Sequence, residues 1–183
     1  MKRAPLFFLL AFWCIVFTTS YLLANEKLNP KDYESHSLFA LDDASFPTKN
    51  AVAELTDEFF SGQTRALKIL FTSEPITDEA IADILNNDAR AVRKKDHAYL
   101  VLFIDKTNKI WQVNLTIVTR GKTVARTVAW KPEELKQFSS MFSYDGKRLQ
   151  LKSKGTFKES SLNLGWDVSL DTPVFDRVAS KTK

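Results

Sequence analysis

The most regular alternation of apolar and polar positions lies near the C-terminus and predicts a β-hairpin. One face of its first strand carries Leu149, Leu151, Ser153, Gly155 and Phe157, and the other carries Arg148, Lys152, Lys154 and Lys158. The second strand turns Leu162, Leu164, Trp166, Val168 and Leu170 to one face. Joining the apolar faces across a loop from Glu159 to Leu162 sets Lys154 opposite Asp167, Leu151 opposite Leu170 and Gly155 opposite Trp166. We expect Trp166 to cover the space that Gly155 leaves.

Four earlier segments also have the pattern of strands. Residues 66–71 and 98–104 are nearly continuous apolar runs, which are typical of strands covered on both faces. A turn over 105–108 follows, and residues 111–117 then alternate in period two, the mark of a half-buried strand. A further strand is expected over 124–130.

Helical spacing of apolar residues predicts three helices. The first covers 48–60, where Val52, Leu55 and Phe59 share one face. The second runs from Thr77, a good N-cap, to about Lys95. Its apolar face consists of Ile81, Ile84, Leu85, Ala89 and Val92. The third begins near Pro132 and has Leu135, Phe138, Met141 and Phe142 on its apolar side.

These elements predict an α+β fold in one domain, residues 47–177. We expect a mixed, mostly antiparallel sheet of about five or six strands with about three helices on one side. The segment from 66 to 104 reads as strand, helix, strand and fits a right-handed parallel crossover. Turn and breaker residues make 25–46 an irregular tether, and 178–183 form a basic tail.

The first 24 residues have the pattern of an export segment. Lys2 and Arg3 precede an uncharged, mostly apolar run over 4–24, which as a helix is long enough to cross a bilayer core. The run predicts either a cleaved signal peptide or a signal-anchor transmembrane helix that holds the chain in the membrane. The charge asymmetry then places the C-terminal domain outside the cytoplasm. The expected location is the cell envelope: single-pass in the inner membrane, or periplasmic or secreted after cleavage.

Composition narrows the class of protein. The single cysteine, Cys14, lies in the export segment, so the domain has no disulfide and no thiolate, as is common in a bacterial envelope. Histidine is nearly absent, with His36 and His97 only, and no metal-ligand spacing or glycine-rich phosphate loop occurs. We therefore expect no metal, no cofactor and no enzymatic activity. Two carboxylates distant in sequence would still suffice for a glycosidase.

Two basic features remain as candidates for binding. Arg90, Arg93, Lys94 and Lys95 lie near the end of the second expected helix, where the helix dipole favours cations. Arg148, Lys152, Lys154 and Lys158 form a stripe on the polar face of the C-terminal hairpin. This stripe is either a solvated face partly neutralised by Asp167 or a contact for an anionic lipid, a glycan or an acidic protein. Nucleic acid is not expected, because the face lacks interleaved aromatic residues.

The sequence thus favours a non-catalytic binding protein of the envelope, with the basic stripe as its partner site. The first alternative is an immunity or inhibitor protein directed against an envelope toxin or enzyme. The second is a hydrolase that acts on glycan or cell wall through two carboxylates.

Overall fold

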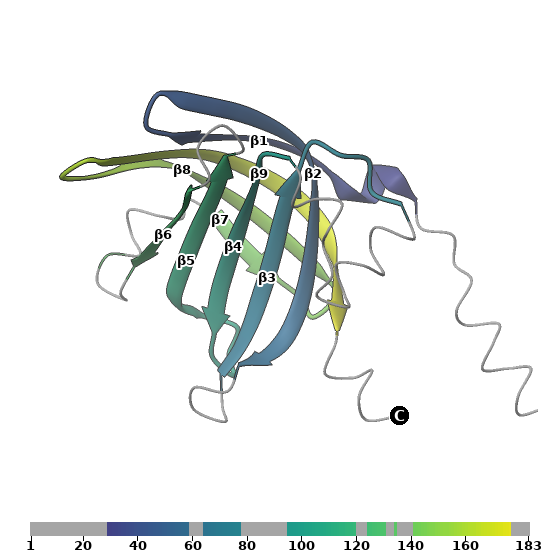
Figure 1. Cartoon of the computed structure of the whole chain (residues 1–183). Coiled ribbons are helices and arrows are strands. Elements are labelled where there is room, and N and C mark those ends of the chain that lie inside the picture. The colour runs from purple at the N-terminus through teal and green to yellow at the C-terminus, as the bar shows by residue number, and fades with distance from the viewer. Residues whose placement is uncertain are drawn as a thin grey trace, which may run out of the picture.

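The computed structural model describes residues 29–58, 64–77, 95–119, 124–130, 134 and 141–176. These residues form an almost purely β structure (Figure 1). A short 3-10 helix, η1 (Pro30–Tyr33), comes first. The strands are β1 (Glu34–Leu41), β2 (Ala44–Glu58), β3 (Thr64–Thr72), β4 (His97–Ile104), β5 (Ile110–Thr119), β6 (Val124–Trp130), β7 (Met141–Tyr144), β8 (Arg148–Glu159) and β9 (Leu162–Asp176).

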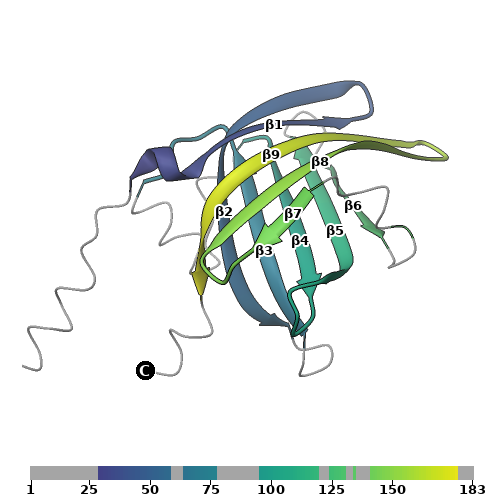
Figure 2. The same ribbon diagram turned by 180° about the vertical axis from the view of Figure 1, so that it is seen from behind.

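All nine strands belong to one sheet with the order β6-β5-β4-β3-β2-β1-β9-β8-β7. Neighbours in this order run antiparallel. The two longest strands bend the sheet. β2 pairs with β1 through its first half and with β3 through its second, and β9 pairs with β1 and then, in parallel, with β2 at Ala53–Leu55. Figure 2 shows the resulting arrangement, with β7, β8 and β9 lying across from β3, β4 and β5.

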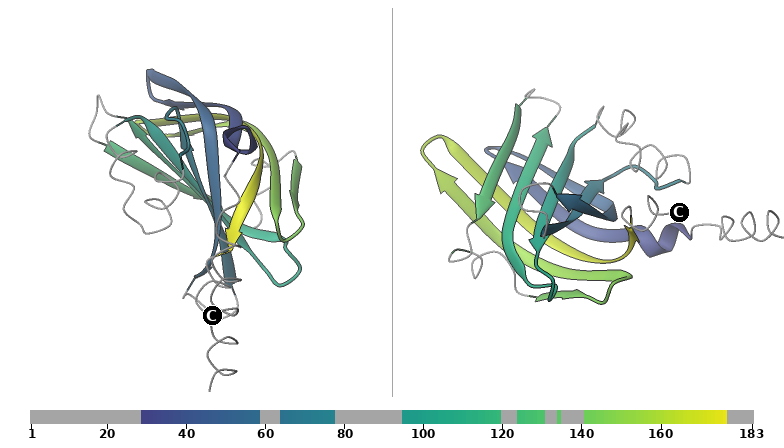
Figure 3. Two further views of the ribbon diagram at one scale, coloured as in Figure 1. Left: turned by 90° about the vertical axis from the view of Figure 1, so that its right-hand side faces the viewer. Right: turned by 90° about the horizontal axis from the view of Figure 1, so that it is seen from below.

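The core fills the space between these two arms of the curved sheet (Figure 3). Inward-facing residues of every strand from β1 to β9 contribute to it, among them the fully buried Phe39, Phe71 and Leu100. The two arms meet where Trp130 of β6 packs edge-on against Trp166 of β9, with ring centroids 5.1 Å apart. The sheet therefore buries its apolar face against itself, without needing a second layer.

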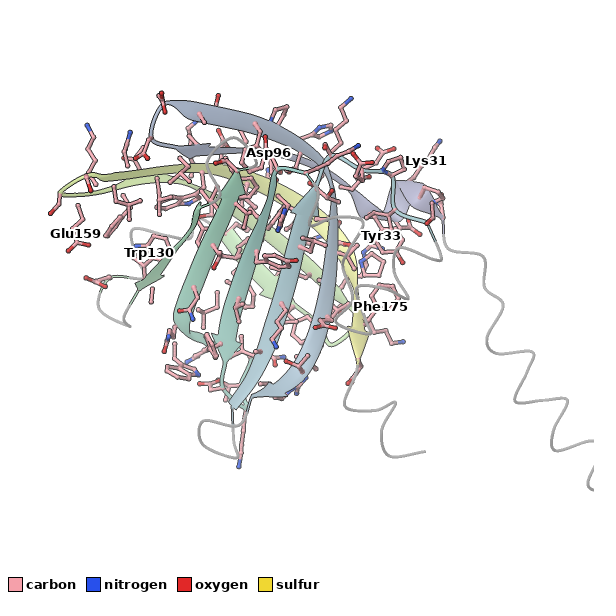
Figure 4. The ribbon with its side chains drawn as sticks, in the orientation of Figure 1. Lys31, Tyr33, Asp96, Trp130, Glu159 and Phe175 are labelled. Carbon is pink, nitrogen blue, oxygen red and sulfur yellow. The ribbon has the colours of Figure 1, made fainter. Side chains whose placement is uncertain are left out.

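A smaller apolar cluster lies on the other side of the sheet. Tyr33 of η1 stacks on Phe175 of β9 with ring centroids 6.1 Å apart, and Val52 and Ile76 complete the cluster. Tyr33 and Phe175 lie side by side at the start of β1 and the end of β9 in Figure 4. This contact fixes the chain that enters β1, and so helps to position β1 beside β9.

The predicted hairpin is confirmed in its register. Lys154 pairs with Asp167, Leu151 with Leu170 and Gly155 with Trp166, and the strands end at Glu159 and begin again at Leu162. Trp166 also covers Gly155 as expected, because a Cβ built on Gly155 would lie 2.6 Å from the Trp166 ring. The strands predicted over 66–71, 98–104, 111–117 and 124–130 are confirmed as β3, β4, β5 and β6.

The predicted α+β class is wrong, and the first expected helix shows why. Residues 48–58 belong to β2, which is buried on both faces: Ala51, Ala53 and Leu55 face the core while Val52 and Glu54 are covered on the other side. A strand buried on both faces has no period-two signature, so the helical spacing of its apolar residues was misleading.

The predicted tether over 25–46 is also corrected, since it holds η1, β1 and the start of β2. β1 does alternate, but two of its inward positions are the buried serines Ser35 and Ser37. Small polar residues on the core face hid the alternation. They lie where β1, β2 and β9 come together, and a small side chain suits such a crowded place.

Three further expectations change. The sheet has nine strands and not five or six, and β3 and β4 are antiparallel neighbours and not a parallel crossover pair. Met141 and Phe142 belong to β7 and not to a helix. Apart from residue 134, the rest of that predicted helix lies outside the described residues. The apolar face of the predicted helix over 77–95 and the basic tail over 178–183 also lie outside them.

The expected transmembrane helix is corrected as well. Across the portion of the chain that the structure describes, no helix has the length and apolar character needed to cross a membrane. This finding stands against the predicted single-pass membrane location. Residues 4–24, on which that prediction rested, lie outside the described portion.

The close approach of Gly155 to Trp166 predicts a large effect of a small substitution. Gly155→Ala should destabilise the fold by about 1–3 kcal/mol, because the added methyl group would displace the indole ring from a packed core. Urea unfolding measures this cost. In a Trp166→Phe background the same substitution should cost less, since the shorter ring leaves room; an equal cost in both backgrounds would contradict the proposed clash.

Candidate functional site

The surface that contains the predicted basic stripe is the outward side of β1, β9, β8 and β7, called here the outer face. Its residues stand opposite one another in rows, because strand registers fix them. One row consists of Leu38, Asp167 and Lys154 from β1, β9 and β8. The next row along the strands consists of His36, Ser169, Lys152 and Met141 from β1, β9, β8 and β7.

The hairpin β8–β9 carries most of the outer face and extends beyond the rest of the sheet. Figure 4 shows its tip, marked by Glu159, on the same side of the molecule as Trp130 of β6 and extending past it. The tip of the β1–β2 hairpin is held against it, since the Asp42 backbone N–H donates to the Asn163 carbonyl oxygen at 2.7 Å and the Asn163 N–H donates to Asp42 Oδ1 at 3.2 Å. The four strands of the outer face are therefore held in one fixed relation.

The structure brings the four predicted cations together on this face, all of them exposed. Arg148 and Lys154 are paired with carboxylates within the chain. Arg148 Nε lies 2.9 Å from Asp171 Oδ1, and Lys154 Nζ lies 2.6 Å from Asp167 Oδ2. The solvated, partly neutralised face was one of the two sequence interpretations, and these contacts agree with it. The outer face has mixed charge and is not a purely basic patch.

Asp171 is the most constrained carboxylate on the outer face. It accepts hydrogen bonds from Gln150 Nε2 at 3.0 Å and from Arg148 Nε at 2.9 Å, and these bonds lower the pKa of its carboxyl below the ordinary value. The turn before β8 supports this arrangement. The backbone N–H groups of Arg148 and Lys147 each donate to Asp145 Oδ1 at 2.8 Å, which lowers the pKa of Asp145 and fixes where β8 begins.

An open hollow of about 310 Å³ lies on the outer face across β1, β9, β8 and β7. Its lining includes Glu34, His36, Met141, Lys152, Ser169 and Asp171. Two carboxylates therefore share the hollow with one lysine. The sequence did not indicate this concavity, because its residues come from strands that are distant along the chain.

The outer face also carries two apolar side chains that sequence reasoning missed. Among the described residues, the large hydrophobic side chains that are strongly exposed are Leu38 at 47% and Met141 at 42%. Both belong to the outer face, at opposite sides of the β9–β8 pair. The alternation of β1 could have revealed that Leu38 is exposed, because Leu38 lies on the same face of the strand as the exposed Glu34 and His36. Met141 was assigned to a helix and could not be placed.

The hollow also contains residue types that hydrolases use. Ser169 stands beside His36 and Lys152, yet the described hydrogen bonds include none that joins Ser169 to either. Asp171, with its lowered pKa and its bonds to Arg148 and Gln150, suits an ion-pair acceptor and not a general acid. No group of three or more His, Cys, Asp or Glu side chains gathers at metal-binding distance within the described ranges.

The remaining predicted candidates lie elsewhere. His97 is buried, and its Nδ1 lies 2.7 Å from the Lys95 carbonyl oxygen while its ring meets the Tyr99 ring edge-on. Lys95 forms an ion pair with Glu74. Arg90, Arg93 and Lys94 lie outside the described residues. Comparisons with protein-family models, curated proteins and solved structures give no match to this chain.

The lowered pKa of Asp171 predicts a pH-dependent contribution to stability. A carboxyl whose pKa is lower in the folded than in the unfolded chain stabilises the fold above its unfolded value, about pH 4, and this contribution is lost as the pH falls through the folded value. Because half of the Asp171 side chain is exposed, we expect no more than about 0.5–1 kcal/mol.

The measurement is urea unfolding of the wild type and of Asp171→Asn from pH 7 to pH 2. The two should differ at pH 7 and converge at the acid end. Arg148→Gln should remove part of the same pH-dependent difference. A difference between wild type and Asp171→Asn that stays constant over the whole range would contradict the role of the ionised carboxylate.

Proposed function

We propose that this chain is a non-catalytic binding domain that docks a protein partner on its outer face. The observation that carries the proposal is the joint position of Leu38 and Met141, the exposed large apolar side chains of the described residues, on either side of the Lys154–Asp167 pair. Apolar anchors among charged groups are the usual composition of a protein interface, where methionine is enriched.

The mixed charge of the outer face favours a protein over the other partners considered. Anionic lipid or a polyanionic glycan would be bound best by uncompensated cations. Here Arg148 and Lys154 already have intramolecular carboxylate partners, and Glu34 adds a further negative charge near Lys152. A protein surface can match both signs of charge and also cover the apolar side chains.

The alternation of the hairpin makes the outer face a rigid platform. Outward residues in the first half of β8 and the middle of β9 alternate with inward residues that pack in the core, such as Leu151, Val168 and Leu170. The backbone that carries the outward side chains is therefore already ordered, so little backbone conformational entropy would be lost on binding. A rigid, preformed surface supports the proposal of a binding domain.

The proposal predicts that the apolar anchors matter more for binding than the paired cations. The full chain, immobilised, should recover a protein partner from extracts of its own cells, quantified by mass spectrometry. Leu38→Asp with Met141→Asp should reduce recovery at least tenfold, because buried anchors dominate interface energies. Neutralising Arg148, Lys152, Lys154 and Lys158 together should also reduce recovery, but less.

Two controls accompany this experiment. Lys106→Gln with Lys109→Gln removes two exposed cations from the turn between β4 and β5, away from the outer face, and should leave recovery unchanged. Each variant should unfold as cooperatively as the wild type in the same urea titration. If the Leu38 and Met141 variant recovers the same proteins in the same amounts as the wild type, the outer face is not the binding surface.

A further inference from the structure

We infer that a second copy of this chain fits the outer face, so that two copies associate through it around a two-fold axis. This inference rests on the proposed protein-binding role of the outer face and names the partner. Its basis is the distribution of charge by strand. β8 presents Arg148, Lys152 and Lys154 outward, and its neighbour β9 presents Asp167 and Asp171. One cationic strand thus lies next to one anionic strand.

A two-fold axis that runs along the strands between β8 and β9 makes this surface complementary to itself. The rotation places β9 of the second copy above β8 of the first, with positions along the strands preserved. Lys154 of each copy then faces Asp167 of the other. Each intramolecular pair of Lys154 with Asp167 becomes one half of a four-charge cluster, and opposite charges are adjacent throughout.

The hollow gives a second, independent point of fit. In this arrangement Lys152 of one copy stands above Ser169 of the other, which lies in the hollow. The hollow also holds two carboxylates, Glu34 and Asp171, against the single ammonium group of its own Lys152, so it suits a second ammonium group. Two copies thereby place a second lysine, Lys152 of the partner copy, into each hollow, and the concavity is filled from the partner and not left between the subunits.

The exposed apolar side chains also correspond. The same rotation places β1 of one copy above β7 of the other. Leu38 then lies above the end of β7 at which Met141 begins the strand. Both copies gain this contact, so the two exposed hydrophobic side chains of each are covered. The charged residues, the hollow and the exposed apolar side chains therefore all match under the same two-fold rotation.

The expected association is weak. Four strands about 4.8 Å apart, over the roughly ten-residue length of the β8 face, cover about 600 Å² per copy, below the roughly 800 Å² typical of each partner in a stable complex. We expect a dissociation constant on the order of micromolar that rises with salt, because exposed charges are screened.

Sedimentation of the full chain from about 1 to about 500 μM tests the inference. The wild type should pass from monomer to dimer over this range. Lys154→Glu alone, or Asp167→Lys alone, should weaken dimerisation at least tenfold, because each places like charges opposite one another across the axis. Lys106→Glu, on the turn between β4 and β5, is the matched control and should dimerise as the wild type does.

Mixing the two single variants provides the decisive arm. A heterodimer of Lys154→Glu with Asp167→Lys restores opposite charges at both symmetry-related contacts, so equimolar mixing should recover wild-type association. A loss of folding in either variant could not be repaired by the other. The inference is overturned if the wild type stays monomeric throughout, if both single variants associate like the wild type, or if mixing restores nothing.

The outcomes separate this inference from the proposed function. The wild type could stay monomeric while substitution of Leu38 and Met141 still abolishes recovery of a protein partner. That result would overturn the dimer but leave the outer face as a binding surface for a different protein. A dimer that is insensitive to the reversals at Lys154 and Asp167 forms elsewhere on the chain.

Discussion

The packing of Trp166 is the contact on which the rest of the structure depends. Its indole ring fills the space above Gly155, meets Trp130 of β6 across the core and donates from Nε1 to Ser153 Oγ at 2.9 Å. These contacts join the two arms of a single curved sheet and hold β9 in one register against β8. Because side chains alternate along a strand, fixing Trp166 inward also fixes Asp167 outward, beside Lys154. The core thereby determines the pattern of the outer face.

The same coupling supports the proposal that the outer face binds a protein and not a simple anion. The hairpin places the exposed cations of β8 beside β9, where Arg148 and Lys154 each meet a carboxylate. Such pairs contribute little to stability at the surface, since water already solvates them well. Their effect is instead to restrict the conformations of the long Arg148 and Lys154 side chains on the face that also carries Leu38, Met141 and the hollow. A partner that binds this surface meets charges whose positions are already set.

The parts of the fold that were predictable from sequence are those where one face is apolar and the other polar. The β8–β9 hairpin meets that condition, and its register follows from matching the apolar faces of the two strands across the loop from Glu159 to Leu162. β2 does not, because both of its faces are covered and its small alanines carry no alternation. β1 could not be predicted for a different reason: polar Ser35 and Ser37 occupy positions on its core face and hide the alternation. Local pattern also cannot reveal that β1 and β9, at opposite ends of the described chain, are neighbours.

The residues of the candidate site also separate into those that the local sequence pattern predicts and those that it does not. Its cations lie on one strand, so their common face could be read from the sequence. The carboxylates that pair with them lie on the next strand, and the Lys154–Asp167 pair followed from the predicted register. Leu38, Met141 and the hollow depend on the placing of β1 and β7 beside that hairpin. No local pattern contains that information, because it arises from the curvature of the whole sheet around its core.

Covalent footprinting of surface lysines tests the central claim, that the outer face is occupied when the protein binds, most directly. Lysines would be acetylated briefly in the full chain at low and at high protein concentration, and their modification compared by mass spectrometry. We predict that Lys152 and Lys154 lose reactivity at high concentration, while Lys106 and Lys109 on the β4–β5 turn keep theirs. Equal reactivity of all four lysines at both concentrations, in a sample that sedimentation shows to be associated, would contradict the account.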